Sequence, residues 1–171
     1  MLVAVLLVLL TTAIASASSV EGIVVRIVDG DTIHVRVGNR IEKVRYIGVN
    51  TPEVHHPRKG EEPGGREATE VNRGLVGARH VRLETDVQTR DRYGRLLAYV
   101  WVDDMMVNAE LVRRGYAQVM TVPPNVRHQA LFVKLQRDAR DAGRGLWRQV
   151  RPAGFRGVLG RAAGARQHLY H

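Results

Sequence analysis

The most restrictive feature of this chain is a period-two alternation of apolar residues near its N-terminal end. Residues 22–37 follow this alternation, and Asp29-Gly30-Asp31 interrupts it. Side chains of a strand point alternately to opposite faces, so the period predicts two strands joined by a tight turn. Gly38-Asn39 gives a second turn signal, and residues 41–49 are predicted to be a third strand. Three strands linked in this way form an antiparallel meander.

The remaining pattern adds two strands and three helices. Thr51-Pro52 ends the third strand, and residues 55–65 are predicted to be an exposed loop. Two further strands are predicted at residues 81–87 and 96–102, and three helices at residues 66–78, 107–114 and 127–142. In the last helix the spacing places Leu131, Leu135, Ala139 and Ala142 inward. The predicted class is α+β, and this order of elements suits a five-stranded OB-fold-type β-barrel with three helices.

The charge balance favours a polyanionic partner. The chain has 171 residues, which suits one domain, and its net charge is +9 with a pI near 10.7. Five arginines and no acids lie in residues 148–171. Residues 149–171 are rich in Gly, Ala and Arg, so we expect a basic, disordered tail there. Charge alone leaves open a solubility feature or attachment to a membrane surface.

The N-terminal residues predict a signal peptide. Residues 1–14 are almost wholly apolar and uncharged, but a membrane-spanning helix needs about 20 such residues. Ala15 and Ala17 form an A-x-A-like cleavage site, so we expect residues 1–17 to be removed and residues 18–148 to form the domain. The protein would then be secreted or extracytoplasmic, with no stable membrane insertion. An uncleaved anchor is the alternative.

The absence of cysteine limits the chemistry that this chain can perform. With no Cys in the sequence, disulfides, thiolate metal sites and Cys nucleophiles are excluded. Any catalytic site must therefore use oxygen and nitrogen groups.

Five short segments carry residues that suit phosphodiester cleavage. They are Asp29-Gly30-Asp31-Thr32, Arg45, Asn50-Thr51-Pro52-Glu53, Arg92-Tyr93-Gly94-Arg95 and Val107-Asn108-Ala109-Glu110-Leu111-Val112. Their order, and the apolar runs between them, resemble the thermonuclease (staphylococcal nuclease-like) family over residues 21–147. The resemblance implies an OB barrel and a calcium-dependent, sugar-nonspecific nuclease acting on DNA and RNA. It also implies cleavage of the P–O5′ bond, which leaves 3′-phosphates.

A candidate metal site lies where two predicted strands meet. Asp31 starts the second strand and Asn50 ends the third, and antiparallel neighbours bring these ends together. Oxygens of an acid, an amide and a main-chain carbonyl suit Ca²⁺. The resemblance implies Asp31, Asn50 and the Thr51 carbonyl as ligands, although the family usually has Asp where Asn50 stands. The alternative is that Asp29-Gly30-Asp31 is only a hairpin turn.

Three charged side chains are candidates for the catalytic work. The resemblance implies that Glu53 acts as a general base or orients water. It implies that Arg45 and Arg95 grip the scissile phosphate, which guanidinium groups can bind through two parallel hydrogen bonds. Taken singly, each of these residues has a simpler interpretation, a solvated loop acid for Glu53 and an exposed structural arginine for the other two.

The substrate-binding residues depart from the family in part. Tyr93 and Arg92 occupy positions that contact substrate phosphate in the family. Thr121 and Pro123 stand where two tyrosines flank the nucleotide in the well-known relative, so base stacking should be weaker here. His55 and His56 are expected to lie on a solvated, substrate-facing loop rather than to bind metal.

Two functional hypotheses follow. The first is an exported nuclease whose cofactor is Ca²⁺ and whose partners are DNA and RNA, acting as a monomer. The second is an OB-fold nucleic-acid-binding module that has lost turnover, which Asn50 and the missing tyrosines favour. We also expect Asn108 and Glu110 to be buried hydrogen-bonding residues, with Glu110 holding the barrel to the helices.

Overall fold

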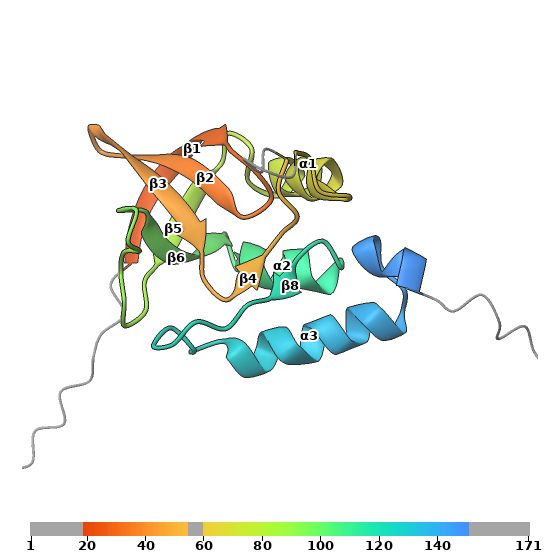
Figure 1. Ribbon diagram of the computed structural model, residues 1–171. Helices are drawn as coiled ribbons and strands as arrows, with labels where there is room; N and C mark the ends of the chain where they lie inside the picture. The colour runs from red at the N-terminus through yellow and green to blue at the C-terminus, as the bar shows by residue number, and fades with distance from the viewer. Residues whose placement is uncertain (1–18, 55–59, 151–171) are drawn as a thin grey trace, which may run out of the picture.

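The predicted meander forms the first three strands of a barrel. The computed structural model describes residues 19–54 and 60–150. Strands β1 (Ser19–Ile27), β2 (Thr32–Val37) and β3 (Arg40–Tyr46) pair in antiparallel order, as Figure 1 shows. The β1–β2 register shifts between Val24 and Arg26. Val24 pairs with the buried Val35 and Ile27 pairs with the buried Ile33, so the shift lets two residues that are three apart both face the core.

Two later strands close the barrel. Strand β5 (His80–Glu84) pairs with β1, and β6 (Leu96–Val102) pairs with β5. A parallel pairing of β3 with β6 then joins the two ends of the sheet. A short strand β7 (Met105–Met106) adds a hairpin to β6. The five-stranded barrel with three α-helices confirms the predicted fold class.

The barrel interior contains the residues that the alternation predicts on β2 and β3. Ile33, Val35 and Val44 have no exposed surface, and Leu83 and Val100 from β5 and β6 meet them in the same core. Burying one such side chain stabilises the fold by about 1.5–3 kcal/mol. A one-residue slip of β2 would expose this set, so the core fixes the register that places the turn after β1.

The third strand is shorter than predicted, and the chain turns after it. The sequence predicts one strand over residues 41–49, but β3 ends at Tyr46 and Gly48 turns the chain with φ +78°. A Cβ at Gly48 would lie 2.7 Å from the Phe132 ring, so a larger residue would clash there. The chain then forms β4 (Val49–Asn50), which pairs with β8 (Gln118–Val119).

The helices pack beside and below the barrel in Figure 1. They are α1 (Gly65–Val76), α2 (Val107–Arg113) and α3 (Gln129–Asp141), and the 3₁₀ helix η1 (Gly145–Val150) follows α3. All three predicted helices are present, with ends shifted by one or two residues. The predicted inward face of α3 is wrong at Leu131, which is 41% exposed, and at Ala142. The buried residues of α3 are instead Phe132 and Ala139. Phe132 packs on Gly48, which turns this side chain toward the barrel.

One buried amide connects α2 to the barrel, as expected for Asn108. Its side chain donates to the Ile47 carbonyl at 2.9 Å and accepts from the Val100 amide at 2.9 Å. The prediction for Glu110 is wrong, because its carboxylate pairs with Arg113 and Arg114 on its own helical turn and the next residue. Arg113 and Arg114 follow Glu110 by three and four residues, so helical spacing was the signal that indicated these partners.

The structure leaves several sequence predictions untested. Within residues 19–54 and 60–150, no helix is long and apolar enough to cross a membrane. The predicted signal peptide, His55, His56 and residues 151–171 of the predicted tail lie outside the described residues, whereas residues 149 and 150 of that tail belong to η1.

Candidate active site

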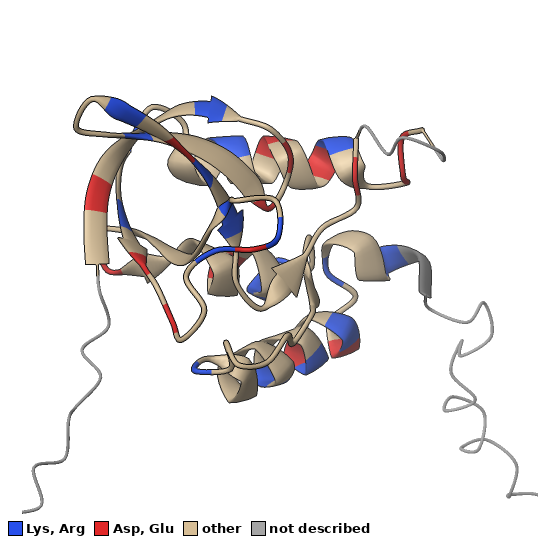
Figure 2. Ribbon diagram, turned by 60° about the vertical axis from the view of Figure 1, so that its left-hand side comes forward, with Lys and Arg blue, Asp and Glu red and all other residues tan. Residues whose placement is uncertain are grey.

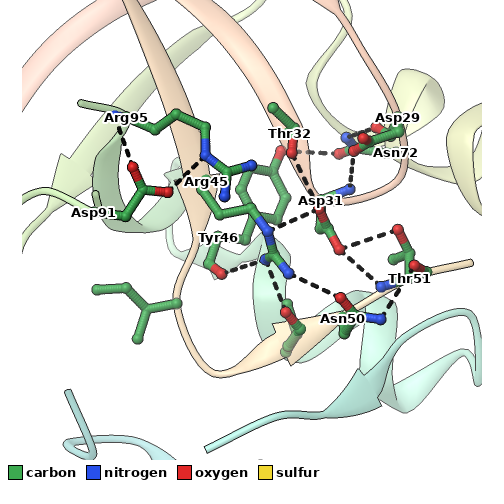
Figure 3. Close-up of polar contacts among 12 residues, drawn as sticks. Asp29, Asp31, Thr32, Arg45, Tyr46, Asn50, Thr51, Asn72, Asp91 and Arg95 are labelled. Atoms are coloured by element: carbon green, nitrogen blue, oxygen red, sulfur yellow. Dashed lines mark hydrogen bonds and ion pairs between the residues drawn. The ribbon is translucent and has the colours of Figure 1, made fainter. Parts of the chain in front are cut away.

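Five of the predicted site residues line one cavity of about 360 Å³. Asp31, Arg45, Asn50, Glu53 and Arg95 all contribute to its wall. They come from the turn after β1, from β3, from β4 and the loop that follows it, and from the β5–β6 connection. Figure 3 shows Asp31, Arg45, Asn50 and Arg95. Segments far apart in the sequence therefore present acids and guanidinium groups to a common space.

Asp31 is held tightly at the base of this group. Its residue is 4% exposed, and its Oδ2 accepts hydrogen bonds from the Thr51 amide at 2.7 Å and the Thr51 hydroxyl at 3.1 Å. Its Oδ1 lies 3.2 Å from Arg45 Nε and accepts from the Thr32 hydroxyl at 3.1 Å. These donors fix the orientation of the carboxylate.

Arg45 is not a solvent-facing structural arginine, because its side chain is only 10% exposed. Its Nη1 donates to the carbonyls of Tyr46 at 2.7 Å and Val49 at 2.8 Å, and its Nη2 donates to Asn50 Oδ1 at 3.0 Å. The turn at Gly48 brings those carbonyls within reach. The guanidinium group is thereby ordered before any substrate arrives, which lowers the entropy cost of binding.

Asn50 and Thr51 complete the predicted metal-binding group. The Asn50 amide nitrogen donates to the Thr51 carbonyl at 3.4 Å, and the Thr51 backbone amide donates to Asp31 Oδ2. The residues that carry the three expected ligand oxygens are therefore in contact with one another. The set offers only oxygens, which fits a hard divalent cation such as Ca²⁺. It carries one formal negative charge, and Arg45 lies beside it. No cluster of three or more His, Cys, Asp or Glu residues suited to a metal occurs in the described parts of the chain.

Asp29 is a cavity residue that the sequence reasoning treated only as part of a turn. Its Oδ1 accepts from the Asp31 amide at 3.0 Å. Burial and the neighbouring Asp31 carboxylate raise the pKa of Asp29 to about 6. Asn72 of α1 anchors this turn, because it donates to the Asp29 carbonyl at 3.0 Å and accepts from the Tyr46 hydroxyl at 2.9 Å. The sequence signal that could have indicated a role for Asp29 in the site was its position one glycine away from Asp31.

Arg95 is oriented by Asp91, a second residue whose role the sequence reasoning missed. Arg95 Nε lies 2.7 Å from Asp91 Oδ2. Asp91 Oδ1 also accepts from the backbone amides of Tyr93 at 2.9 Å and Arg95 at 3.0 Å. Although burial opposes it, hydrogen bonding from Arg95 and these amides holds the pKa of Asp91 below its usual value. The carboxylate thus stabilises both the turn and the direction of the arginine.

Arg92 and Tyr93 lie beside the cavity rather than in its wall. Tyr93 is 67% exposed, and the guanidinium carbons of Arg92 and Arg95 lie 4.7 Å and 5.6 Å from its ring centre. These contacts are cation–π interactions, which connect the exposed phenol to Arg95. Met120 and Val122 also line the cavity, and they adjoin Thr121 and Pro123, which stand where the family resemblance predicts tyrosines.

Comparison with known proteins identifies the family. The sequence matches the family described as staphylococcal nuclease homologue over residues 43–149. The chain belongs to the staphylococcal nuclease family. It is 37% identical over 135 residues to a thermonuclease of Staphylococcus intermedius, covering 77% of this chain and 80% of that protein. It is 38% identical over 124 residues to a thermonuclease of Staphylococcus hyicus, covering 72% and 73%.

A third relative extends the family beyond the staphylococci. Endonuclease YncB of Bacillus subtilis is 37% identical over 139 residues, which cover 78% of this chain and 66% of that protein. The family resemblance drawn from the five motifs is confirmed, and so is the expected class of enzyme, a nuclease. The roles of individual residues in this member of the staphylococcal nuclease family remain predictions.

Proposed function

We propose that this chain is a Ca²⁺-dependent, sugar-nonspecific nuclease that hydrolyses P–O5′ bonds of DNA and RNA and leaves 3′-phosphates. The observation that carries the proposal is the single cavity lined by Asp31, Asn50, Glu53, Arg45 and Arg95. A phosphodiester anion repels nucleophiles, so hydrolysis needs positive groups around the phosphate and a group that activates water. The cavity offers both kinds of group.

The two arginines bind and orient the scissile phosphate. Arg45 is fixed by the Tyr46 and Val49 carbonyls, and Arg95 by the Asp91 carboxylate, so both keep their orientation without substrate. Donors held in advance stabilise the charge that develops in the transition state, and removing one typically costs about 2.7–4 kcal/mol. Arg92 and Tyr93 contact the neighbouring phosphate from outside the cavity.

Glu53 accepts the proton of the attacking water or holds that water in line with the P–O5′ bond. Two hydrogen bonds to Glu62 hold the backbone of Glu53. The Glu53 amide donates to Glu62 Oε2 at 3.1 Å, and the Glu53 carbonyl accepts from the Glu62 amide at 2.8 Å. Gly65 packs so closely on the Glu53 carbonyl that a Cβ there would lie 2.9 Å from the oxygen. These contacts place Glu53 at the cavity wall.

The residues that would hold Ca²⁺ are Asp31, Asn50 and the Thr51 carbonyl. When bound, the cation supplies positive charge that the phosphate oxygens share with the arginines. The enzyme would act as a monomer. Export by a signal peptide over residues 1–17, with residues 18–148 as the nuclease domain and residues 149–171 as a basic tail, fits the composition of these segments.

Digestion with and without a chelator tests the function. We expect the full chain to degrade plasmid DNA, single-stranded DNA and RNA with Ca²⁺, and to stop when EDTA is added. Glu53→Gln should lower kcat by about 10²–10⁴-fold while nucleic-acid binding stays within twofold, because general-base catalysis contributes that much. Glu67→Gln, which removes an exposed acid of α1, is the matched control.

The alternative is a nucleic-acid-binding module without turnover. The neutral Asn50 and the replacement of two tyrosines by Thr121 and Pro123 favour it. Binding of nucleic acid without digestion, at any Ca²⁺ concentration up to 10 mM (a range of about 10⁻⁷–10⁻³ M covers most protein calcium sites), would replace the nuclease with this alternative.

A further inference from the structure

Three basic side chains form a row across the outside of the barrel. Arg26 of β1 pairs in register with His34 of β2, and His34 pairs with Lys43 of β3. Cross-strand partners share a face of the sheet, and the intervening residues Ile33 and Val44 point into the core. Arg26 and Lys43 are exposed and His34 is half-buried. We call Arg26, His34 and Lys43 the basic row.

The basic row adjoins the cavity. Arg45 and its cross-strand partner Thr32 both line the cavity, and each lies two residues along its strand from a member of the row, Lys43 or His34. Two residues of strand span about 6.6 Å on the same face. The row is therefore the next layer of side chains beyond the cavity wall, on the outer surface of β2 and β3.

A second layer continues the same face. Arg36 lies two residues beyond His34, and its cross-strand partners are Ile23 and Ile41. Arg36 is exposed, and the two isoleucines are 37% and 52% exposed. The outer face of β1–β3 therefore combines cations with exposed aliphatic groups, which suits a ligand having both anionic and apolar surfaces.

The cations of this face have no acidic partners among the ion pairs of residues 19–54 and 60–150. None of those pairs involves Arg26, Arg36 or Lys43, whereas Arg82, Arg90 and Arg127 each contact a carboxylate. Burial, together with the charges of Arg26 and Lys43, lowers the pKa of His34. A proton is thus disfavoured at the centre of the row, as expected in a positive potential.

We propose that the outer face of β1–β3, made of the basic row and Arg36, binds the phosphate backbone of the nucleic-acid strand that extends from the cleavage site. This inference rests on the proposed nuclease function and adds a path for the substrate. Continuity with the cavity favours a nucleic-acid strand over an anionic membrane, because a strand whose phosphate occupies the cavity must leave across one of its edges. Basic positions on the barrel strands are visible in blue in Figure 2.

Charge removal with a matched control tests the path. The variant Arg26→Gln/Lys43→Gln removes two charges from the row, and Lys134→Gln/Arg137→Gln removes two from α3, which lies below the barrel in Figure 1 while β1–β3 lie above. Binding of a fluorescein-labelled single-stranded 20-mer (about 20 nucleotides, longer than the 4–16 covered by one OB fold) is measured by anisotropy on the full chain in EDTA.

The expected loss follows from counterion release. Each phosphate contact on a single strand contributes a salt exponent of about 0.7, which is a factor of about five in affinity at 0.1 M relative to 1 M salt. The row variant should therefore bind about 25-fold more weakly at 0.1 M salt, with a salt slope reduced by about 1.4, and should match the parent near 1 M. Equal weakening in the α3 variant, or an unchanged slope in the row variant, would overturn the proposal.

Two further readouts separate this inference from the proposed function. A dinucleoside monophosphate has one phosphate, which occupies the cavity and leaves none for the row, so its hydrolysis should keep the same kcat and KM in the row variant. Saturation with the 20-mer should raise the pKa of His34, followed by NMR, because a phosphate offsets the charges of Arg26 and Lys43.

The outcomes distinguish the two proposals. A parent protein that cleaves the 20-mer while the pKa of its His34 does not change contradicts the proposed substrate path alone. A parent that neither binds nor cleaves contradicts both proposals, and selective binding of phosphatidylserine vesicles through the row would assign the face to a membrane instead.

Discussion

Replacing the amide of Asn50 with a carboxylate tests the proposed metal site directly. In the structure, Asn50 Oδ1 lies 3.0 Å from Arg45 Nη2, and Arg45 Nε lies 3.2 Å from Asp31 Oδ1. Asp31 supplies the only formal negative charge among the proposed ligands, and Arg45 largely balances it. Asn50→Asp keeps an oxygen in place for both Arg45 and the cation, and adds one negative charge to the group.

The expected gain in affinity follows from Coulomb's law. Asn50 is solvent-exposed, so the dielectric constant of water is appropriate, and two unit charges 4 Å apart then contribute about 1 kcal/mol. A divalent cation doubles this to about 2 kcal/mol, which is about 30-fold in the dissociation constant. The new carboxylate is also repelled by Asp31 and attracted by Arg45, but both of these interactions are present with and without the cation. We therefore expect Ca²⁺ to bind Asn50→Asp about 30-fold more tightly.

Isothermal titration calorimetry of the full chain with CaCl₂ measures this difference without depending on catalysis. Asn50→Ala is the matched control, and it should bind Ca²⁺ more weakly than the parent because it removes the oxygen. The gain in Asn50→Asp should also shrink as salt is raised, since exposed charges are screened. Equal Ca²⁺ affinity in the parent, Asn50→Asp and Asn50→Ala would remove Asn50 from the ligand set and refute the reasoning.

Two further predictions concern the acids that hold arginines. Asp91→Asn should lower kcat by about tenfold or more in single-turnover cleavage, because a displaced Arg95 no longer meets the phosphate; an unchanged kcat in a normally folded variant would show that Arg95 is positioned otherwise. Hydrogen bonds from Arg113 and Arg114 lower the pKa of Glu110 from 4.5 to about 2. This stabilisation is present above pH 4.5 and is lost as the pH falls toward 2. Because both arginines are about half exposed, Glu110→Gln should cost only about 1–2 kcal/mol at pH 7 and almost nothing at pH 2, measured by urea unfolding, and a loss independent of pH would contradict the charge argument.

The fold was predictable because local and long-range signals agreed along the meander. Alternation in residues 22–37 marked the inward side chains Ile33 and Val35, and the turn residues marked the strand ends. Alternation did not show which side chains of the first strand face inward, because the β1–β2 register shifts between Val24 and Arg26 and a bulge changes the parity without changing the composition. Helical spacing also predicted Leu131 to face inward, but Phe132 is the buried residue. Which of these two neighbours packs on the barrel depends on the space at Gly48, which the sequence does not show.

The site was predictable as a set of residues but not as a set of contacts. Motif order indicated that Asp31, Asn50 and Arg45 would meet, yet no pattern showed that Arg45 donates to Asn50 or that Asp91 holds Arg95. Such contacts depend on the local backbone, at the turn around Gly48 for Arg45 and at the turn of residues 91–95 for Arg95.

The contact between Arg45 and Asn50 also bears on how this chain can tolerate an amide where the family resemblance predicts an acid. An amide oxygen still accepts from Arg45 Nη2, so the arginine keeps its orientation even though the site loses a negative charge. The amide therefore separates two proposed tasks of one side chain, since it weakens attraction for a cation while it preserves the orientation of Arg45, the proposed phosphate-binding group. If that separation holds, Asn50→Ala should impair cleavage at saturating Ca²⁺, whereas Asn50→Asp should alter the Ca²⁺ requirement and leave the saturated rate near that of the parent.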